Sequence, residues 1–294
     1  MNINYKELAN LFTSNHLNEL AKGNLSLVEH IRDTFFRNQK NITISGIFDQ
    51  SFELLTENYP NEYIYKNMII QKLFLTKYDF NKATILTEFR VGQRKADCVI
   101  LNGKSTCYEI KTELDSLHRL SFQLEAYEKL FNEVYVVCSS KFTKKLLNDL
   151  EPHFGIIEFT PKMTLRKIRK SSIENATIDK NLMMQSLRQP EYKMMASTIS
   201  NEDIIVPNTE IYDYCFKIIK NFKNEKKLNK IYIDILKTKR KNDDKIIEKF
   251  PSSLINAAIS YNFLKSDLEQ LTNILNFQKG ESENVLPNIT RETT

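Results

Sequence analysis

The pattern of hydrophobic and polar positions is sharpest in the middle of the chain, over residues 62–160. Apolar residues recur three and four positions apart over 62–77, which predicts a helix of about four turns. Residues 84–91 are rich in β-branched and aromatic side chains and therefore predict a strand. Two more short β-runs follow at 96–101 and 105–111. This part of the chain is thus predicted to be one helix followed by three strands.

A strand, a helix and another strand are predicted to form a crossover after these three strands. Asp115 precedes a run whose apolar residues keep helical spacing to about Asn132. Val134–Cys138 is an unbroken apolar run, typical of a strand that is buried on both faces of a parallel sheet. A helix at 141–151 and a strand at 156–159, which we expect to be the last of the sheet, complete the order.

The segments on either side of this core are predicted to be mainly helical. Residues 1–60 read as an N-terminal helical segment, and residues 208–278 read as an all-helical C-terminal region. A connector at 163–207 joins the latter to the core at 61–162, and residues 279–294 have the composition of a disordered tail. The predicted fold class is therefore α/β, with helices flanking a central sheet.

Composition excludes several classes of protein. Only 6 of the 294 residues are glycine, and neither G-x-G-x-x-G nor G-x-x-x-x-G-K-[ST] occurs, so we expect no nucleotide cofactor. The 42 basic residues exceed the 37 acidic ones by only five, a balance that permits a polyanionic partner without requiring one.

The cysteine and hydropathy patterns favour a cytoplasmic protein. The four cysteines lack C-x-x-C spacing and three lie in apolar runs, so we expect buried free thiols in a reducing compartment. The N-terminus has no signal-peptide pattern, and no run approaches 18 uncharged apolar residues, so the chain is not expected to enter a membrane.

Three charged residues stand where the predicted strands should be apolar. Asp97 lies in the second strand, and Glu109 and Lys111 flank Ile110 at the end of the third. Buried charges normally pair with one another or bind metal. Two carboxylates beside a lysine make an oxygen-rich pocket suited to Mg²⁺ or Mn²⁺. Strand alternation places Glu109 and Lys111 on the same face.

Whether Asp97 joins this face depends on the hairpin between the two strands. A two-residue loop at Asn102-Gly103 would pair residue 97 with residue 108 and turn Asp97 away from Glu109. A three-residue loop, or one bulge, would pair residue 97 with residue 109 instead. A metal site therefore predicts an odd loop or a bulge near residues 102–105.

The pattern Asp97-x₁₁-Glu109-Ile110-Lys111 on a hairpin, preceded by a helix that carries Glu62 and followed by a crossover, resembles the PD-(D/E)XK nuclease superfamily. Ala96 stands where the family name has proline. The resemblance implies a restriction-endonuclease-like αβββαβ core with a mixed sheet. It also implies a phosphodiesterase that depends on Mg²⁺, for which Mn²⁺ can substitute, and that usually acts on DNA, as in repair or in defence against foreign DNA.

The resemblance also assigns roles to the residues that match the motif. Asp97 and Glu109 would be metal ligands, with the carbonyl of Ile110 as a third. Lys111 would position or activate the attacking water and stabilise charge on the phosphorus. Glu62 matches the acidic residue that many members carry on the preceding helix, and Glu88 on the first strand is a rival for that role, including as a ligand.

Gln123-x-x-x-Tyr127 on the following helix is similar to the Q-x-x-x-Y element of the exonuclease-like branch. Both residues join the candidate catalytic set, although packing alone explains a tyrosine on an apolar stripe. Arg119 lies four residues before Gln123 and could contact a phosphate or simply pair with Asp115.

Positive charge is concentrated in the C-terminal region. Residues 217–249 hold eleven lysines and one arginine against five acids, so the rest of the chain is slightly acidic. We expect Lys226, Lys227 and Lys230 to contact a nucleic-acid backbone, DNA before RNA, although a solvated lysine-rich face is an equal alternative. The candidate nucleic-acid contacts also include Arg94, Lys95 and Arg119.

Two function classes stay open at this point. One is a metal-dependent nuclease, and the other is a catalytically inactive module on the same fold that binds nucleic acid or a protein. Nucleases that cut both strands are often dimers, so the resemblance also allows a homodimer.

Overall fold

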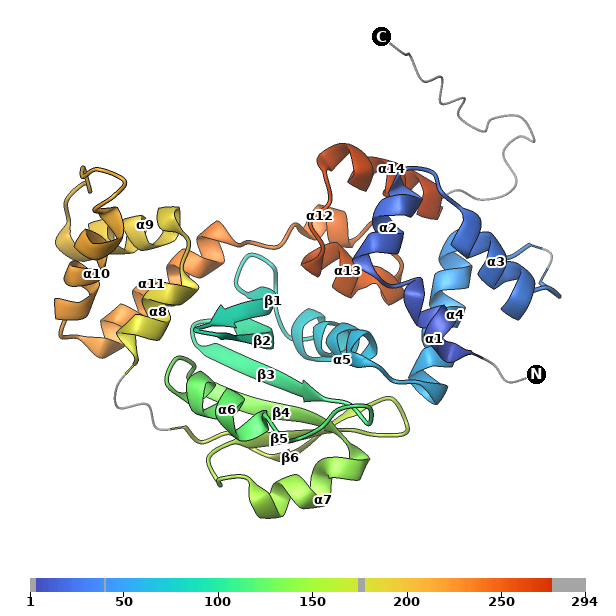
Figure 1. The fold of residues 1–294 in the computed structure, drawn as a ribbon, viewed down its shortest axis with the longest axis horizontal. Helices are drawn as coiled ribbons and strands as arrows, with labels where there is room; N and C mark the ends of the chain where they lie inside the picture. Colours follow the sequence, from blue (N-terminus) through green and yellow to red (C-terminus); the bar gives the residue numbers. More distant parts are fainter. Residues whose placement is uncertain (1–3, 40, 174–177, 277–294) are drawn as a thin grey trace, which may run out of the picture.

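The computed structural model describes residues 4–39, 41–173 and 178–276, and its centre is one six-stranded sheet (Figure 1). The strands are β1 (Thr84–Val91), β2 (Arg94–Leu101), β3 (Ser105–Lys111), β4 (Glu133–Ser139), β5 (Gly155–Phe159) and β6 (Leu165–Arg169). They lie side by side in sequence order. β1, β2 and β3 are antiparallel, β3, β4 and β5 are parallel, and β6 returns antiparallel to β5. The chain is therefore an α/β protein with a mixed sheet.

Helices cover both faces of this sheet. They are α1 (Tyr5–Asn10), α2 (Ser14–Ala21), α3 (Ser26–Phe35), α4 (Ile44–Asn58), α5 (Glu62–Ile69), α6 (Leu120–Glu128), α7 (Ser140–Asp149), α8 (Lys180–Ser186), α9 (Gln189–Ser200), α10 (Ile211–Asn221), α11 (Glu225–Lys239), α12 (Asp244–Ile247), α13 (Ile255–Ser260) and α14 (Lys265–Asn276), with a π-helical turn η1 (Ile70–Leu75) and a 3₁₀ turn η2 (Ser252–Leu254). One apolar core joins a face of the sheet to α6–α11. A second core joins the other face to α1–α5, α13 and α14. The sheet is thus buried on both sides.

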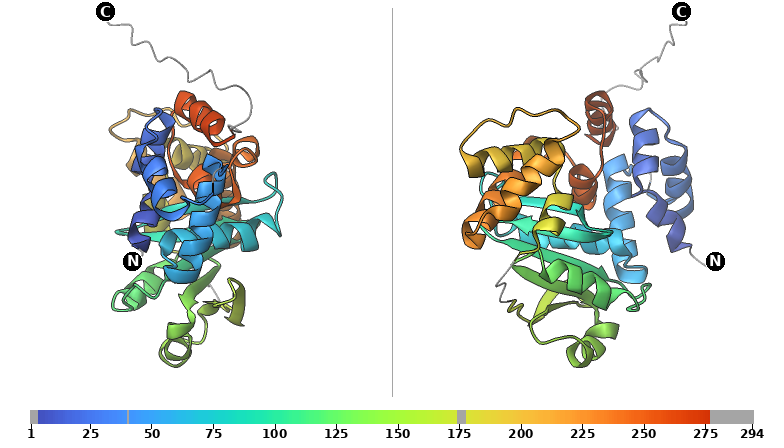
Figure 2. Two further views of the ribbon diagram at one scale, coloured as in Figure 1. Left: turned by 90° about the vertical axis from the view of Figure 1, so that its right-hand side faces the viewer. Right: turned by 60° about the vertical axis from the view of Figure 1, so that its left-hand side comes forward.

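The N-terminal and C-terminal helices of the chain lie side by side. α14 packs against α2 and α4, and α13 packs against α5 and β1. Figure 2 (right) shows that α8–α11 lie at the opposite end of the molecule from α1–α4. The C-terminal region is helical to residue 276, as predicted, but it divides between the two ends because α11 leads back across β1 to α12. The predicted tail at 279–294 lies outside the described residues.

The sequence prediction was wrong about the last strand. We expected the strand at 156–159 to end the sheet, but β6 follows it, inside the predicted connector. β6 reads Leu-Arg-Lys-Ile-Arg and is half-buried or exposed along its length. An edge strand with one solvated face needs few apolar residues, because backbone hydrogen bonds hold it. The three basic residues of β6 therefore left no apolar pattern from which the strand could be predicted.

Two helix boundaries also differ from the prediction. The helix expected over 62–77 is α5 followed by the π-helical turn η1, where the backbone widens. The helix expected from Asp115 begins at Leu120 instead. The carboxylate of Asp115 accepts hydrogen bonds from the backbone N–H and the hydroxyl of Thr112, both at 2.8 Å, so it caps a turn rather than the helix.

The hairpin between β2 and β3 has a three-residue loop. Leu101 pairs with Ser105 and Cys98 pairs with Tyr108, so Asn102–Lys104 form the loop, with Gly103 at φ 96°. Continuing this register places Asp97 opposite Glu109. The hairpin thus has the odd loop that a shared carboxylate site requires.

Other sequence expectations concern the cysteines and the membrane. All four cysteines are buried and free, as predicted. Among the described residues, no helix has both the length and the hydropathy needed to cross a membrane.

Candidate active site

Four of the predicted site residues form one network between β3 and α6. Glu109 is 1% exposed, and the ammonium of Lys111 donates hydrogen bonds to Glu109 Oε1 at 2.8 Å and to Gln123 Oε1 at 3.1 Å. The Tyr127 hydroxyl lies 3.1 Å from Glu109 Oε2 and 2.7 Å from the carbonyl of Lys95. Gln123 and Tyr127 share a helix face because they are four residues apart. The network therefore fixes both Glu109 and the lysine.

The ionisation of Glu109 reflects a buried charge that is only partly compensated. Burial raises the pKa of Glu109 above its ordinary value, while Lys111, Tyr127 and Gln123 oppose the shift. A carboxylate withdrawn from water requires a nearby positive charge or several donors. This site supplies both. Lys111 provides the positive charge, Tyr127 provides a hydrogen-bond donor, and Glu109 in turn holds the ammonium of Lys111 in place.

Asp97 lies at the centre of the site. Its Oδ2 accepts a 2.6 Å hydrogen bond from the backbone N–H of Ile110. Burial, followed by repulsion from Glu109, raises the pKa of Asp97 well above its ordinary value, and the Ile110 hydrogen bond only partly offsets this. The arrangement places two carboxyl groups close together in a poorly solvated position, which favours a proton or a further cation there.

The backbone of Ile110 also faces this position. The N–H and C=O of one strand residue point to the same side of the strand, so the carbonyl of Ile110 emerges on the side of Asp97. The paired register of β2 and β3 ends at Cys98 and Tyr108, so β2 does not pair with Ile110. The expected third ligand is therefore directed toward the site.

Two further carboxylates complete an acidic cluster, which we define as Glu62, Glu88 and Asp97. Oxygen atoms of all three lie within 4.8 Å of one another. Glu62 comes from the first turn of α5, and Glu88 comes from β1 at the position opposite Asp97. The sequence left Glu62 and Glu88 as rivals for one role, and the structure brings both to Asp97. Both are about half-exposed, so the cluster opens to solvent.

Lys66 is the member of the site that the sequence analysis missed. Its ammonium lies 2.6 Å from Glu62 Oε1 and also contacts Glu88 Oε1. Burial alone would lower the pKa of Lys66, but Glu62 and Glu88 raise it above its ordinary value. The available signal was its position four residues after Glu62 on a predicted helix, since such pairs are neighbours.

The backbone of β1 is distorted at Glu88. Glu88 has a φ of 51°, which is unusual for any residue other than glycine. Leu86 and Phe89 both pack in the core on the α6 side, although strict alternation would put them on opposite faces. The neighbouring strand β2 breaks the alternation in the same way, because Ala96 and Val99 also lie in that core although they are three residues apart. The irregular backbone lies between the two core residues of each strand, and it directs Glu88 toward Asp97.

This distortion predicts an unusual order of stability among variants. Glu88→Gly should be more stable than Glu88→Ala by about 1 kcal/mol, because a Cβ at positive φ is strained and glycine is not. Chemical denaturation of the two variants measures the difference, and neither retains the carboxylate. Equal stabilities, or a more stable alanine variant, would show that residue 88 is not held in a left-handed conformation.

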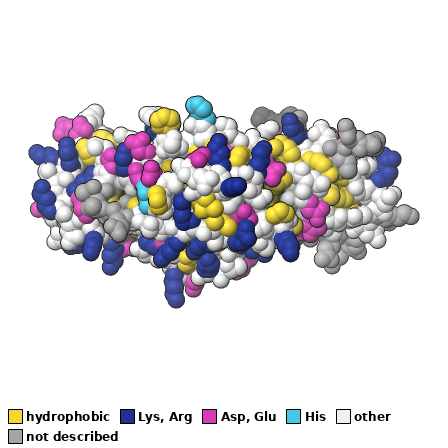
Figure 3. Space-filling model, turned by 90° about the horizontal axis from the view of Figure 1, so that it is seen from below, with side chains coloured by type: hydrophobic (Ala, Val, Ile, Leu, Met, Phe, Trp, Pro, Cys, Tyr) yellow, Lys and Arg dark blue, Asp and Glu magenta, His cyan; other side chains and the backbone are white. Residues whose placement is uncertain are grey.

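The basic residues predicted to contact nucleic acid are not gathered at the site. Lys95 is closest, with its ammonium 3.9 Å from Glu88 Oε2, and Arg94 is half-buried at the start of β2. Arg119 is exposed before α6, and in the described parts of the chain it makes no hydrogen bond to the network or to Asp115. Lysines and arginines on the face in Figure 3 are spread among acids rather than collected in one patch.

The lysines predicted in the C-terminal region lie far from the acidic cluster. Lys226, Lys227 and Lys230 are exposed in the first half of α11. Residue 239 ends the same helix beside β1, about 20 Å from residue 226 at 1.5 Å per residue. Their predicted contact with nucleic acid would therefore have to occur outside the site.

The residues present suit a hard divalent cation. The acidic cluster offers three carboxylates, Glu109 lies close enough to raise the pKa of Asp97, and the strand geometry directs the Ile110 carbonyl toward the same side. Oxygen ligands are those that Mg²⁺ and Mn²⁺ prefer. Burial and then repulsion from Glu109 raise the pKa of Asp97, so a cation beside it would relieve an unfavourable charge. Lys66 opposes this fit, because it already neutralises part of the charge of Glu62 and Glu88.

Comparison with known proteins places the chain in a family. Residues 55–271 match the family model described as Bacteriophage P4 protein cII, which spans most of the chain and includes every site residue described above. The chain belongs to this family. It is 27% identical over 164 residues to "Protein cII" of Enterobacteria phage P4, which covers 53% of the chain and 60% of that relative. The match therefore spans less than two thirds of the relative's length.

A solved structure also resembles part of the chain, at a low level. It is the SPO1766 protein of unknown function from Silicibacter pomeroyi, with a TM-score of 0.28 and 13% identity over 43% of this chain and 87% of that one. A likeness at this level carries no argument about the site.

Proposed function

We propose that the chain is a divalent-metal-dependent nuclease of the PD-(D/E)XK type that hydrolyses phosphodiester bonds in nucleic acid, DNA before RNA. The observation that carries the proposal is convergence on Asp97. Glu62 from α5 and Glu88 from β1 place oxygen atoms within 4.8 Å of Asp97, and the backbone N–H of Ile110 in β3 donates to it. Glu109 lies close enough to raise the pKa of Asp97, and Lys111, Gln123 and Tyr127 form the network that holds Glu109. Together these residues include all those predicted from the sequence to be catalytic. The αβββαβ order of α5, β1, β2, β3, α6 and β4 also supports a restriction-endonuclease-like core.

In this proposal Asp97 and Glu109 hold the metal ion together with the Ile110 carbonyl, and Glu62 or Glu88 adds a ligand. A bound divalent cation supplies electrostatic stabilisation of the phosphate and lowers the pKa of water. The Lys111 ammonium orients the attacking water and stabilises negative charge on the phosphate oxygens. Glu109 and Gln123 hold that ammonium in place, and Tyr127 holds Glu109.

Lys66 would balance charge at the outer side of the site. Its ammonium links Glu62 to Glu88 and keeps two half-exposed carboxylates from repelling each other. Such an arrangement keeps the acidic cluster assembled before a cation arrives, at the cost of competing with that cation.

The same lysine favours a second candidate function. With Lys66 on Glu62 and Glu88, and Lys111 on Glu109, three of the four carboxylates already have a cationic partner. A fold that needs no metal could serve as a catalytically inactive module that binds nucleic acid or a protein. Asp97 separates the two candidates, because it lies beside these pairs and no salt bridge to it is present among the described residues.

A panel of substrates tests the proposal. Purified protein is incubated with linear, circular and single-stranded DNA and with RNA, each with Mg²⁺, with Mn²⁺ and with EDTA. The nuclease should produce fragments only with a divalent cation, and circular substrates separate internal from terminal cleavage. Binding without any cleavage across the panel would favour the inactive module.

A further inference from the structure

A line of cavities runs from the acidic cluster along the outer edge of β1. The first cavity, about 260 Å³, is lined by Glu62, Lys66, Glu88 and Ser260. The second, about 450 Å³, shares Glu88 and Ser260 with the first. A third, about 390 Å³, shares Lys241 with the second. We call this line of cavities the β1 trench.

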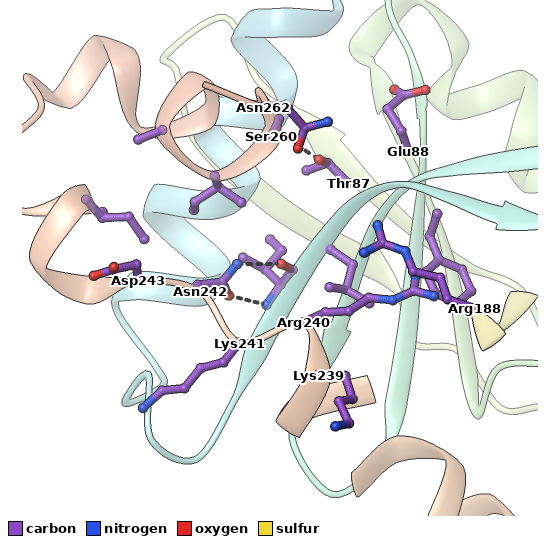
Figure 4. A pocket seen from close by; sticks show the side chains of 16 residues that line it. Thr87, Glu88, Arg188, Lys239, Arg240, Lys241, Asn242, Asp243, Ser260 and Asn262 are labelled. Carbon is purple, nitrogen blue, oxygen red and sulfur yellow. Dashed lines mark hydrogen bonds between the residues drawn. The ribbon is translucent and has the colours of Figure 1, made fainter. Parts of the chain in front are cut away.

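The walls of the trench are held in place by an amide that pairs with the edge strand. Asn242 Nδ2 donates to the carbonyl of Ile85 at 2.9 Å, and Asn242 Oδ1 accepts from the Ile85 N–H at 2.8 Å (Figure 4). This contact takes the place of a neighbouring strand, and it fixes the segment after α11 beside β1. α13 forms the opposite wall and is fixed through the hydrogen bond between Thr87 and Ser260 at 2.9 Å.

Basic side chains from two segments line the middle of the trench. Arg188, before α9, and Lys239 and Lys241, at the end of α11, are exposed, and none forms a salt bridge within the described residues. In the segments that the structure describes, the ammonium of Lys241 donates to Asn81 Oδ1, a neutral acceptor, at 3.0 Å. Figure 4 shows Glu88 at the far side of the same cavity, with its carboxylate pointing away from these cations.

Arg240 differs from its basic neighbours because Glu191 already neutralises its charge. Its guanidinium donates to both carboxylate oxygens of Glu191, at 2.7 and 2.6 Å, and to the carbonyl of Ser186, and it lies 5.3 Å from the centre of the Phe89 ring. This buried pair holds α9, α11 and β1 together. Because Arg240 supplies the salt bridge to Glu191, the ammonium groups of Lys239 and Lys241 are not needed to neutralise that carboxylate.

We infer that the β1 trench binds single-stranded nucleic acid and leads it to the acidic cluster. This inference rests on the proposed function, since the carboxylates mark the end where a phosphate would react. Proteins that bind single strands combine a positively charged groove along the backbone with aromatic rings that stack on bases. Arg188, Lys239 and Lys241 supply the charge, and the half-buried rings of Tyr63 and Tyr261 line the acidic end.

The dimensions of the trench favour a single strand over a duplex. Its largest cavity has about the volume of a small-molecule pocket and is walled on both sides by α13 and by the segment after α11. A duplex is far broader, since its major groove alone is about 12 Å wide. A duplex would therefore have to open before a strand enters.

Binding of labelled oligonucleotides tests the inference. Anisotropy is measured in Ca²⁺, at several salt concentrations, with single-stranded DNA and RNA and with a duplex of the same sequence. One variant carries Arg188→Ala, Lys239→Ala and Lys241→Ala. The matched control carries Lys141→Ala, Lys144→Ala and Lys145→Ala, which removes the same charge from exposed positions on α7. The Tm of each variant checks that it is folded.

The trench variant should bind single strands at least about tenfold more weakly, and the slope of log K against log salt should fall by about 2, because each lost phosphate contact contributes about 0.7. The control should change little. The inference would be overturned if both variants lost affinity equally or if the control lost more. It would also be overturned if the duplex bound more tightly than the single strand, or if the unaltered protein bound neither. If the protein binds single strands through the trench but does not cleave them, the proposed function alone is overturned. If the trench variant cleaves as fast as the unaltered protein, the inference alone is overturned.

Discussion

Replacing Lys111 with methionine is expected to lower metal-dependent cleavage by about 10²-fold or more. Methionine keeps most of the buried stem of the lysine but removes the ammonium that would stabilise charge on the phosphate, and loss of one such donor costs about 10²–10³ in kcat. The measurement is the cleavage rate of a labelled oligonucleotide at saturating Mg²⁺. A matched control is Lys104→Met, which breaks a similar lysine–glutamate pair with Glu133 on the surface and should leave the rate unchanged.

The Lys111→Met variant will also be less stable, because it leaves Glu109 buried without its cation. A double variant separates this effect from catalysis. Glu109→Gln together with Lys111→Met removes both charges and should recover stability relative to the single variant, while cleavage stays lost. If cleavage returned with stability, Lys111 would be a structural partner of Glu109 and not a catalytic residue.

Asp97→Asn is expected to stabilise the metal-free protein. Asparagine keeps an oxygen that can accept the hydrogen bond from the Ile110 N–H, and it removes a charge that burial and Glu109 disfavour. Since the folded protein raises the pKa of Asp97 above its ordinary value of 3.8, the stability linked to its proton is present at low pH and is lost as the pH rises through the folded pKa. The Tm of the variant in EDTA should therefore exceed that of the unaltered protein at pH 7, and the two should converge below about pH 4.

Addition of Mn²⁺ should reverse this order. A cation that binds only the folded protein stabilises it by about 2.7 kcal/mol at a hundredfold excess over Kd. The unaltered protein should gain Tm in Mn²⁺, whereas Asp97→Asn should gain little. If the variant had a lower Tm than the unaltered protein in EDTA, or if Mn²⁺ raised both Tm values equally, the Asp97 carboxylate would be neither unfavourable in the metal-free protein nor a metal ligand.

The core of the fold was predictable because its apolar pattern is strong. The strand at 84–91 and the strand at 105–111 have the bounds expected from the sequence, and 134–138 lies within β4. In contrast, β6 escaped prediction because an edge strand gains its stability from backbone hydrogen bonds that leave no hydrophobic pattern. The start of α6 was misplaced because Asp115 caps a turn as readily as a helix.

The candidate site was predictable as a set of residues but not as a geometry. Asp97, Glu109 and Lys111 stood out as charges within apolar strands, yet only the three-residue loop of the hairpin decides that the first two are opposite each other. The positive φ of Glu88 and the contact between Lys66 and Glu88 depend on how β1 and α5 pack. A basic trench assembled from residues 188 and 239–241 depends on tertiary structure in the same way, because those segments are distant in the sequence.

We propose that carboxylates around Asp97 hold a divalent cation and that the protein, with the help of Lys111, hydrolyses phosphodiester bonds at this cation. The most direct measurement is a cleavage time course on a labelled single-stranded oligonucleotide, in Mn²⁺, then in excess EDTA, then with Mn²⁺ restored. Cleavage should start, stop and resume for the unaltered protein, and it should be absent throughout for Lys111→Met and Asp97→Asn prepared in parallel. No cleavage by the unaltered protein in Mn²⁺, or equal cleavage by all three proteins, would contradict this proposal.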